Sequence, residues 1–421
     1  MSFFGCILVI SVLTPFLLSA QVGTCSSSKK DKVYKSLDEA LNDKENVKIL
    51  NLNYKLNGDF PGEIEQLTCL EEIYLRYNNL KKFPKELLKL DNLKVIDISN
   101  NKLAKVPKEL AQLKELTSLG LSNNILTTIP PVIGELSQLK ELECGRNKIE
   151  YLPEELCKLN KLERLVLGGN KLESLPDNIG NLMNLVTLSA NANQIVKIPS
   201  GIGNMSKLEL LDLSVNKLKM LPGDFSQLQS LIWLKLEGNE FEKFPDALNS
   251  LKNLEKLYMT SCQIDTIEAN WDMPKLEILY LSNNDLKSFT GDLSKLVSLK
   301  RLWLKDNKLT VIPNAVTSIP NLERLYLLDN QISKLVGDIT KMQKLERLSL
   351  ERNKINFVTS SISEMNSLVA LQLNGNPITN LPRSIKDCKN LINIYIVDTK
   401  LTESQIEDLK SIVPETTLIF Y

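Results

Sequence analysis

The sequence predicts a curved α/β solenoid, with a parallel sheet on its concave face and short helical or 3₁₀ segments on its convex face. The first observation is a repeat, because an apolar residue returns every 23 residues along most of the 421-residue chain. Only the step from Leu254 to Leu276 is shorter, at 22 residues. The repeats start at Val47, Leu70, Leu93, Leu116, Leu139, Leu162, Leu185, Leu208, Leu231, Leu254, Leu276, Leu299, Leu322, Leu345, Leu368 and Leu391.

The second observation is that each unit contains two different periods. Its first part alternates apolar and polar residues, as in Ile96-Asp97-Ile98, which is typical of a strand. Its second part spaces apolar residues by three, as at Leu110 and Leu113, which indicates a helical or 3₁₀ turn. One unit cannot bury its own apolar face, so neighbouring units must stack. With strands about 4.8 Å apart, sixteen strands would form a sheet roughly 75 Å long.

An asparagine occupies one fixed position in most units, where its amide can both donate to and accept from backbone groups at a turn. The position holds Lys55 in the first unit, Cys262 in the tenth and Thr399 in the last. We expect the asparagines to be structural. They are Asn78, Asn101, Asn124, Asn147, Asn170, Asn193, Asn216, Asn239, Asn284, Asn307, Asn330, Asn353 and Asn376.

The resulting pattern, L-x-x-L-x-L-x-x-N-x-L followed by an apolar residue and often proline, resembles the leucine-rich repeat family over roughly residues 47–421. The family implies a horseshoe-shaped solenoid. The chain resembles bacterial surface leucine-rich repeat lipoproteins, and also the Ras-linked leucine-rich repeat group that organises signalling complexes. The family uses Cys as an alternative at the Asn position, which accounts for Cys262.

A proline follows in most units and is lost in four of them, at Glu268, Thr290, Val336 and Thr359. Because proline fixes φ, these losses predict a different local curvature in the C-terminal half. Trp271, in the short unit, falls where other units place Leu or Ile, so we expect it in the core of the outer side.

The first residues predict export. Residues 3–20 form an apolar run, and no charged residue precedes Lys29, which is typical of a signal-peptide core but lacks its usual basic start. The sequence that ends at Thr24-Cys25 resembles a bacterial lipoprotein cleavage box, although Thr24 is an unusual residue there. We therefore predict a signal peptide at 1–24 and lipid attachment at Cys25. An ordinary secretory peptide or an uncleaved anchor remains open.

The rest of the chain divides into four predicted parts. A polar tether covers 25–34, and an N-terminal cap helix covers 35–46 because Ser36 and Glu39 have capping-box spacing. The repeats cover 47–398. A C-terminal cap covers 399–421, with a helix from Glu403 to Ile412 and a last strand from Thr416 to Tyr421.

Charge and cysteine content narrow the function. Lys+Arg and Asp+Glu both number 51, so nucleic acid is not expected as a partner. Beyond Cys6 and Cys25, five cysteines are scattered among the repeats, and we interpret all five as packing residues rather than a disulfide framework. They are Cys69, Cys144, Cys157, Cys262 and Cys388.

No catalytic, cofactor or metal site is predicted. The chain contains no histidine, which removes histidine-based acid-base chemistry and the commonest metal ligand. It also contains no phosphate-binding loop, no dinucleotide fingerprint and no cysteine pair at metal spacing. We therefore expect no enzyme and no small-molecule substrate.

The strand alternation directs two columns of side chains to the concave face. Their C-terminal half gathers aromatic and arginine residues, which are enriched in binding hot spots. The predicted partner-binding residues are Trp233, Tyr258, Tyr280, Arg301, Trp303, Arg324, Tyr326 and Arg347. The alternative is structural: neighbouring rings would stack on each other, and Arg324 and Arg347 would pair with Glu323 and Glu346. A weaker second candidate comprises Tyr54, Tyr74, Arg76 and Tyr77.

The sequence thus predicts a non-enzymatic recognition module, exported and lipid-anchored at an outer-membrane or cell surface. It would bind a protein or glycan partner on its concave face. The first alternative is an intracellular, cytoplasmic signalling scaffold. The second is a surface structural or adhesive protein.

Overall fold

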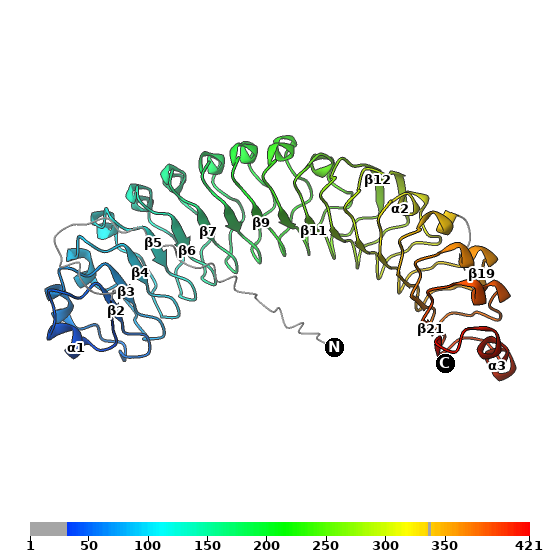
Figure 1. Cartoon of the computed structure of the whole chain (residues 1–421). Helices are drawn as coiled ribbons and strands as arrows, with labels where there is room; N and C mark the ends of the chain where they lie inside the picture. The colour runs from blue at the N-terminus through cyan, green and yellow to red at the C-terminus, as the bar shows by residue number, and fades with distance from the viewer. Residues whose placement is uncertain (1–31, 336–337) are drawn as a thin grey trace.

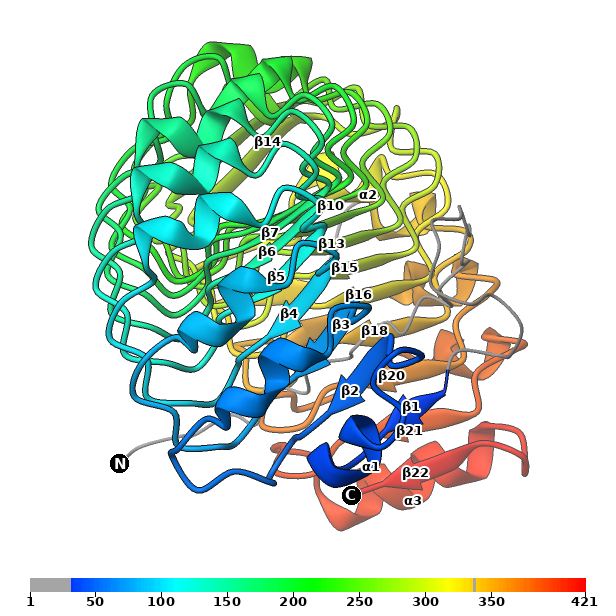
Figure 2. The same cartoon turned by 90° about the vertical axis from the view of Figure 1, so that its left-hand side faces the viewer.

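The computed structural model describes residues 32–335 and 338–421. They form one curved solenoid, in which the strands line the concave face and short helical segments line the convex face (Figure 1). Viewed along the arc from its N-terminal end, the strands and the 3₁₀ segments lie on separate sides of the coil (Figure 2). The predicted fold class is confirmed. The predicted signal peptide and Cys25 lie outside the described residues.

The concave face is a single parallel sheet of 18 strands. Each repeat contributes one strand, and each strand pairs with those of the preceding and following repeats. The repeat strands are β2 (Ile49–Asn51), β3 (Glu72–Tyr74), β4 (Val95–Asp97), β5 (Ser118–Gly120), β6 (Glu141–Glu143), β7 (Arg164–Val166), β8 (Thr187–Ser189), β9 (Leu210–Asp212), β10 (Trp233–Lys235), β11 (Lys256–Tyr258), β13 (Ile278–Tyr280), β15 (Arg301–Trp303), β16 (Arg324–Tyr326), β18 (Arg347–Ser349), β20 (Ala370–Gln372) and β21 (Asn393–Tyr395).

The asparagine column satisfies the backbone where each strand turns outward. The Asn216 amide donates to the carbonyls of Leu213 and Ala190, and its oxygen accepts from the amide of Ile195. These side chains are buried or nearly so, and each joins its own unit to the previous one. The structural role expected for them is therefore confirmed.

Cys262 fills the same position with different chemistry. Its sulfur donates to the carbonyl of Leu236, which lies 26 residues earlier, as do the carbonyls that the asparagines reach. In other units the asparagine side-chain oxygen accepts a hydrogen bond from a backbone amide of the previous unit. Here the backbone carbonyl oxygen of Cys262 accepts that bond instead, from the amide of Phe241. A thiol therefore suffices at this one position.

Short 3₁₀ helices cover most of the convex face. Many begin directly after the proline column, whose prolines are the N-cap residues and have extended backbone, as at Pro84 and Pro107. Their apolar residues, such as Leu110 and Ile133, are fully buried against the sheet. The helices are η1 (Gly62–Gln66), η2 (Lys85–Lys89), η3 (Lys108–Gln112), η4 (Pro131–Glu135), η5 (Glu154–Lys158), η6 (Ile179–Asn181), η7 (Ile202–Asn204), η8 (Gly223–Gln227), η9 (Asp246–Leu248), η10 (Asp338–Lys341), η11 (Ser360–Glu364) and η12 (Arg383–Asp387).

The units without proline change the convex face. Strands β12 (Thr266–Asn270) and β14 (Ser288–Asp292) form a separate parallel pair, in which Glu268 lies opposite Thr290. Both residues stand where other units have proline, and a proline could not donate to such a ladder. A second outer pair joins β17 (Lys334–Leu335) and β19 (Phe357–Val358), and a short helix, α2 (Asn314–Thr317), lies between the two pairs.

Trp271 lies in the outer core of the short unit, as expected, with no exposed surface. Its ring stacks on Phe244 at 4.4 Å between centroids and packs against Phe289 at 5.6 Å. The missing residue of this unit is therefore accommodated on the outer side. On the inner side, β11 and β13 stay in register.

Both ends of the sheet carry an extra strand and a helix. Helix α1 (Leu37–Leu41) begins after Ser36, whose side chain accepts from the amide of Glu39. Helix α3 (Glu403–Ile412) occupies the residues predicted to be helical, with a capping box at its start, and β22 (Leu418–Phe420) extends the sheet. The predicted tether is wrong at its end, because Val33–Tyr34 form β1, held by pairing with β2 and by the burial of Tyr34.

The cysteines behave in two ways. Cys144, Cys157, Cys262 and Cys388 are buried free thiols, which fits the packing interpretation. Cys69 is disulfide-bonded, so the packing interpretation is wrong there. The physical reason is its position, since Cys69 is only half-buried whereas the four free thiols are buried.

Candidate functional site

The concave face of β10, β11, β13, β15, β16 and β18 carries the eight residues that the sequence singles out. In each of these strands the middle residue is fully buried, as Leu302 is in β15. The first and third residues therefore lie on the other side of the sheet, half-buried or exposed apart from the buried Ser349 of β18. Tyr258, Tyr280, Trp303 and Tyr326 are third residues, and Trp233, Arg301, Arg324 and Arg347 are first residues.

Four rings form one continuous stack, which we call the ring ladder: Tyr258, Tyr280, Trp303 and Tyr326. Successive centroids lie 4.9, 4.1 and 5.0 Å apart, with interplanar angles of 12°, 16° and 13°. Each ring is half-buried. Stacking by itself does not mark a site, because Tyr395 and Phe420 also stack at the C-terminal end of the sheet.

Beside the ring ladder runs an arginine row of Arg301, Arg324 and Arg347. The sheet register places Arg301 opposite Arg324 and Arg324 opposite Arg347. Within residues 32–335 and 338–421, none of the three forms a salt bridge. The predicted alternative of pairing with Glu323 and Glu346 is therefore wrong, and the Glu323 carboxylate lies instead 4.0 Å from the Lys300 ammonium.

Trp233 lies apart from the ring ladder, in the first-residue column of β10. The ammonium of Lys256 sits 4.1 Å above the centre of its ring. A second lysine, Lys235, lies 5.8 Å from the centre of the Tyr258 ring. Sequence reasoning places both lysines in the concave columns but gives neither a role. The signal that could have found them is the register, which sets Trp233 beside Lys256 and Lys235 beside Tyr258.

Burial tunes the tyrosine hydroxyls of the ring ladder. It raises the pKa of Tyr258, with smaller contributions from Tyr280 and Glu237. It also raises the pKa of Tyr280, and this outweighs Arg301, whose charge acts in the opposite direction. Both hydroxyls therefore stay protonated at neutral pH and can donate a hydrogen bond to a partner.

The N-terminal half of the same face has the opposite charge. In strands β3–β9, the first and third residues include five acids and one base, Arg164. Every one of these acids accepts a hydrogen bond: from the Tyr74 hydroxyl to Glu72, from Arg76 to Asp97, from Ser118 to Glu141, from Arg164 to Glu143, and from the Ser214 amide to Asp212.

The second candidate, near the N-terminus, separates into two parts. Tyr54 and Tyr77 stack at 4.5 Å, remain 70% and 47% exposed, and both have left-handed backbone, with φ of 60° and 59°. Tyr74 and Arg76 instead bond Glu72 and Asp97 on the sheet. The structure thus brings together only the first two as an exposed aromatic pair.

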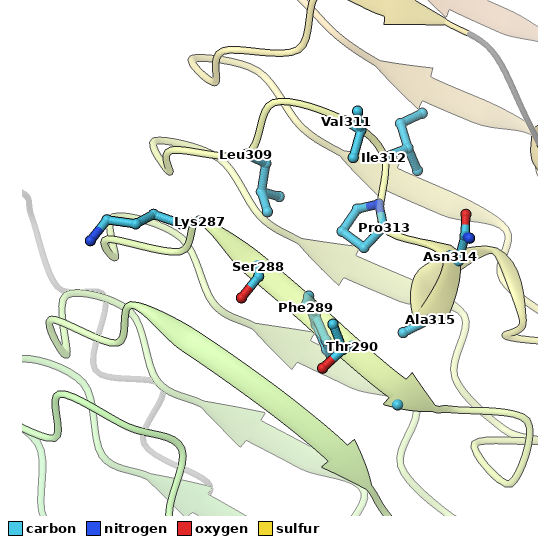
Figure 3. Close-up of a pocket in the computed structure, with 11 residues that line it drawn as sticks. Lys287, Ser288, Phe289, Thr290, Leu309, Val311, Ile312, Pro313, Asn314 and Ala315 are labelled. Carbon is cyan, nitrogen blue, oxygen red and sulfur yellow. The ribbon is translucent and has the colours of Figure 1, made fainter.

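A pocket of about 340 Å³ lies on the outer side, between β14 and the segment that leads into α2 (Figure 3). Figure 3 shows Phe289 and Thr290 on one side and Pro313 and Ala315 on the other. Lys287 is its one charged lining residue, so the pocket offers no acid-base pair. Across the described part of the chain, no cluster of three potential metal ligands occurs, and no helix is long and apolar enough to span a membrane.

Comparisons with known proteins settle the family. The family model described as "Leucine rich repeat" matches residues 68–126, 274–332 and 320–378, and "Leucine-rich repeat region" matches 132–211 and 179–282. A leucine-rich repeat protein of Leptospira interrogans is 33% identical, covers 93% of this chain and 100% of its own, and superimposes with a TM-score of 0.80. The chain belongs to the leucine-rich repeat family. This fold typically serves protein interaction.

Two other solved leucine-rich repeat structures are similar in fold. A plant peptide hormone receptor in complex with RGF2 is 26% identical, with a TM-score of 0.70, and the match covers 90% of this chain and 63% of the receptor. The functional domain of the internalin InlJ from Listeria monocytogenes is 21% identical, with a TM-score of 0.58, covering 79% of this chain and 74% of that domain. A search of curated proteins gave no match.

Proposed function

We propose that this leucine-rich repeat protein is a non-enzymatic recognition module that binds a protein or glycan partner on its concave face. The observation that carries the proposal is the ring ladder with the arginine row beside it, seven aromatic and arginine side chains fixed by one rigid sheet. Aromatic and arginine residues dominate binding hot spots, and a rigid sheet lowers the ordering cost of binding.

The comparisons support a protein or peptide as the partner class. The plant receptor is described as a peptide hormone receptor in complex with RGF2, and it shares the repeat architecture over most of this chain. The similarity concerns the scaffold, so the partner of this chain has to come from its own concave side chains.

The recognition proposal is tested with Trp303→Ala and Tyr326→Ala. The purified protein would be applied to arrays of immobilised extracellular proteins and of oligosaccharides, and retained binders quantified by titration. We expect each variant to weaken binding by about 30-fold, the loss of about 2 kcal/mol typical of a hot-spot residue. Circular dichroism should show an intact array. Tyr151→Ala is the matched control, because Tyr151 is exposed but lies outside the ring ladder. Unchanged affinity in both ladder variants would refute the proposed site.

We further propose that the protein is exported and anchored to a membrane by a lipid on Cys25. The support is the apolar run at residues 3–20 followed by Thr24-Cys25.

Membrane fractionation with surface protease digestion tests the anchor, comparing the wild type with Cys25→Ala. The proposal expects a membrane-bound, protease-accessible wild type and a released variant. Ser28→Ala, which changes a nearby residue and keeps Cys25, is the control and should remain membrane-bound. A soluble, protected wild type would contradict export and favour an intracellular scaffold.

A further inference from the structure

The arginine row is unusual because it concentrates like charge without compensation. Neighbouring strands lie about 4.8 Å apart, so the three guanidinium groups sit on adjacent steps of the sheet. Like charges on directly opposite positions are destabilising. No carboxylate in the described chain lies within 4.0 Å to offset them. An anionic partner would remove this repulsion on binding.

The ring ladder limits what else that partner can be. Interplanar angles of 12° to 16° at 4.1 to 5.0 Å mean that the rings lie face to face. Tyr280 and Trp303 have neighbours on both faces, so they present only edges and polar groups to solvent. A sugar ring needs an open aromatic face, and both faces of the two central rings are occupied, so only the outer faces of Tyr258 and Tyr326 lack a stacked ring. Ring edges carry the positive end of the quadrupole and favour negatively charged groups.

The first and third residues of β11, β13, β15, β16 and β18 include no acid and four bases: Lys256, Arg301, Arg324 and Arg347. The acids of β3–β9 lie on the same face and already have hydrogen-bond partners. These two columns of the concave face therefore form a charge gradient along the arc, negative toward β3 and positive toward β18, while Glu237 and Glu351 lie outside the two columns. A ligand that lies along the arc meets both ends.

We propose that the partner presents an extended acidic peptide segment, whose carboxylates lie on the arginine row and whose neutral or basic continuation points toward β3–β9. The inference rests on the proposed recognition function and adds the chemical class of the ligand and its orientation along the concave sheet. Arg301 and Arg347 are two strands, or about 10 Å, apart. In an extended peptide, alternate side chains on one side lie about 6.7 Å apart, so two acidic residues in a short segment can reach the row.

Selection from a random dodecapeptide display library tests the proposal. The full chain is compared with the triple variant Arg301→Glu, Arg324→Glu, Arg347→Glu. We expect peptides rich in Asp and Glu from the wild type and loss of that enrichment with the variant. Lys85→Glu, Lys108→Glu, Lys158→Glu is the matched control, because these exposed lysines lie on the convex helices η2, η3 and η5. It should select the same peptides as the wild type.

The best peptide, labelled with fluorescein, then gives the affinity. The triple variant should bind it at least about tenfold more weakly, which corresponds to about 1.4 kcal/mol. Raising the salt concentration should weaken the wild type more than the variant, because charge pairing is screened. Replacement of the three arginines by lysine should retain part of the affinity, which shows that folding of the glutamate variant is not the cause. A label placed at either peptide end reports direction by its quenching of Trp303.

The outcomes separate the two proposals. Selection of neutral or basic peptides, or retention of neutral oligosaccharides by wild type and triple variant alike, would overturn the acidic-peptide inference and leave the recognition function standing. Failure of the wild type to retain any peptide or oligosaccharide above the Trp303→Ala variant would overturn both. Acidic peptides that bind the triple variant equally well would also overturn the inference.

Discussion

The two halves of the concave face have the same repeat but differ in how their charged side chains are paired. In strands β3–β9 the charged side chains are mostly acidic, and each acid accepts a hydrogen bond from its own sheet. In strands β13–β18 the charged first residues are arginines without a salt bridge in the described chain. The concave strands have three residues each and belong to one parallel sheet in both halves, so the difference on this face comes from the side chains.

The comparison shows that the charged side chains stabilise the fold in strands β3–β9 and do not do so in strands β13–β18. Partnered polar groups add to folding, whereas a row of like charges costs folding free energy. A natural protein that breaks a local rule in one region usually does so at a functional site. The difference between the two halves can therefore be tested by measuring the stability of variants, without knowledge of the partner.

The largest expected effect is in the N-terminal half, for Asp97→Ala. Asp97 is 6% exposed, and its carboxylate accepts from the Ser99 amide at 3.0 Å and from the Arg76 guanidinium. Removing it takes the carboxylate partner away from the amide of buried Ser99 and from the half-exposed Arg76, which costs about 1–3 kcal/mol. Urea unfolding measures the loss, and Asp97→Asn, which keeps an acceptor, should lose less. Equal stability of the alanine variant and the wild type would show that the two halves do not differ in this way.

A smaller effect is expected for the paired arginine of the C-terminal half. Arg352 donates twice to Asp329, at 2.6 Å each, and this holds the pKa of Asp329 below its usual range. Because the folded pKa is depressed, the stabilisation is present above about pH 4 and is lost as pH falls through the folded value.

Asp329→Asn should therefore cost about 0.5–1 kcal/mol at neutral pH, a modest value because Arg352 is largely exposed. As pH falls through the folded pKa of Asp329, the difference in stability between the variant and the wild type should disappear, which acid titration of the unfolding midpoint measures. Asp91→Asn, at an exposed aspartate of another repeat unit, is the control. A stability difference that persists at low pH would contradict the assignment.

The smallest effect, and of opposite sign, is expected for Arg324→Gln. The change removes the central charge of the arginine row, so folding should gain about 0.3–0.5 kcal/mol at low salt and nothing near 1 M salt. Thermal unfolding at both salt concentrations gives the comparison, with the exposed convex Lys85→Gln as control. Destabilisation of Arg324→Gln would indicate that the row is partnered after all.

Much of the fold could be predicted from the sequence because each unit repeats the same burial pattern. Every predicted repeat start from Val47 to Leu391 is at most 4% exposed in the structure. The concave columns followed from strand alternation, which fixes the face of each residue once the register is set by the 23-residue period.

The remainder depended on information that a single sequence lacks. The loss of proline marked Glu268 and Thr290 as different, but proline loss does not say that the outer segments pair as strands. The disulfide of Cys69 was missed because spacing alone does not show which cysteine stays outside the core. The absence of salt bridges at Arg324 and Arg347 was also missed, because a neighbouring glutamate in sequence points to the other side of a strand.

The short unit shows what length variation does to this molecule. Its missing residue is absorbed around Trp271 on the outer side, and Tyr258 and Tyr280 remain opposite each other on the inner side. Each repeat unit therefore adds one residue to each column of the concave face, at a spacing of about 4.8 Å between neighbouring strands. Inserting or deleting a whole unit would lengthen or shorten the concave surface by one strand. A change of length in the outer segment of a unit, as in the short unit, would leave the concave residues in register.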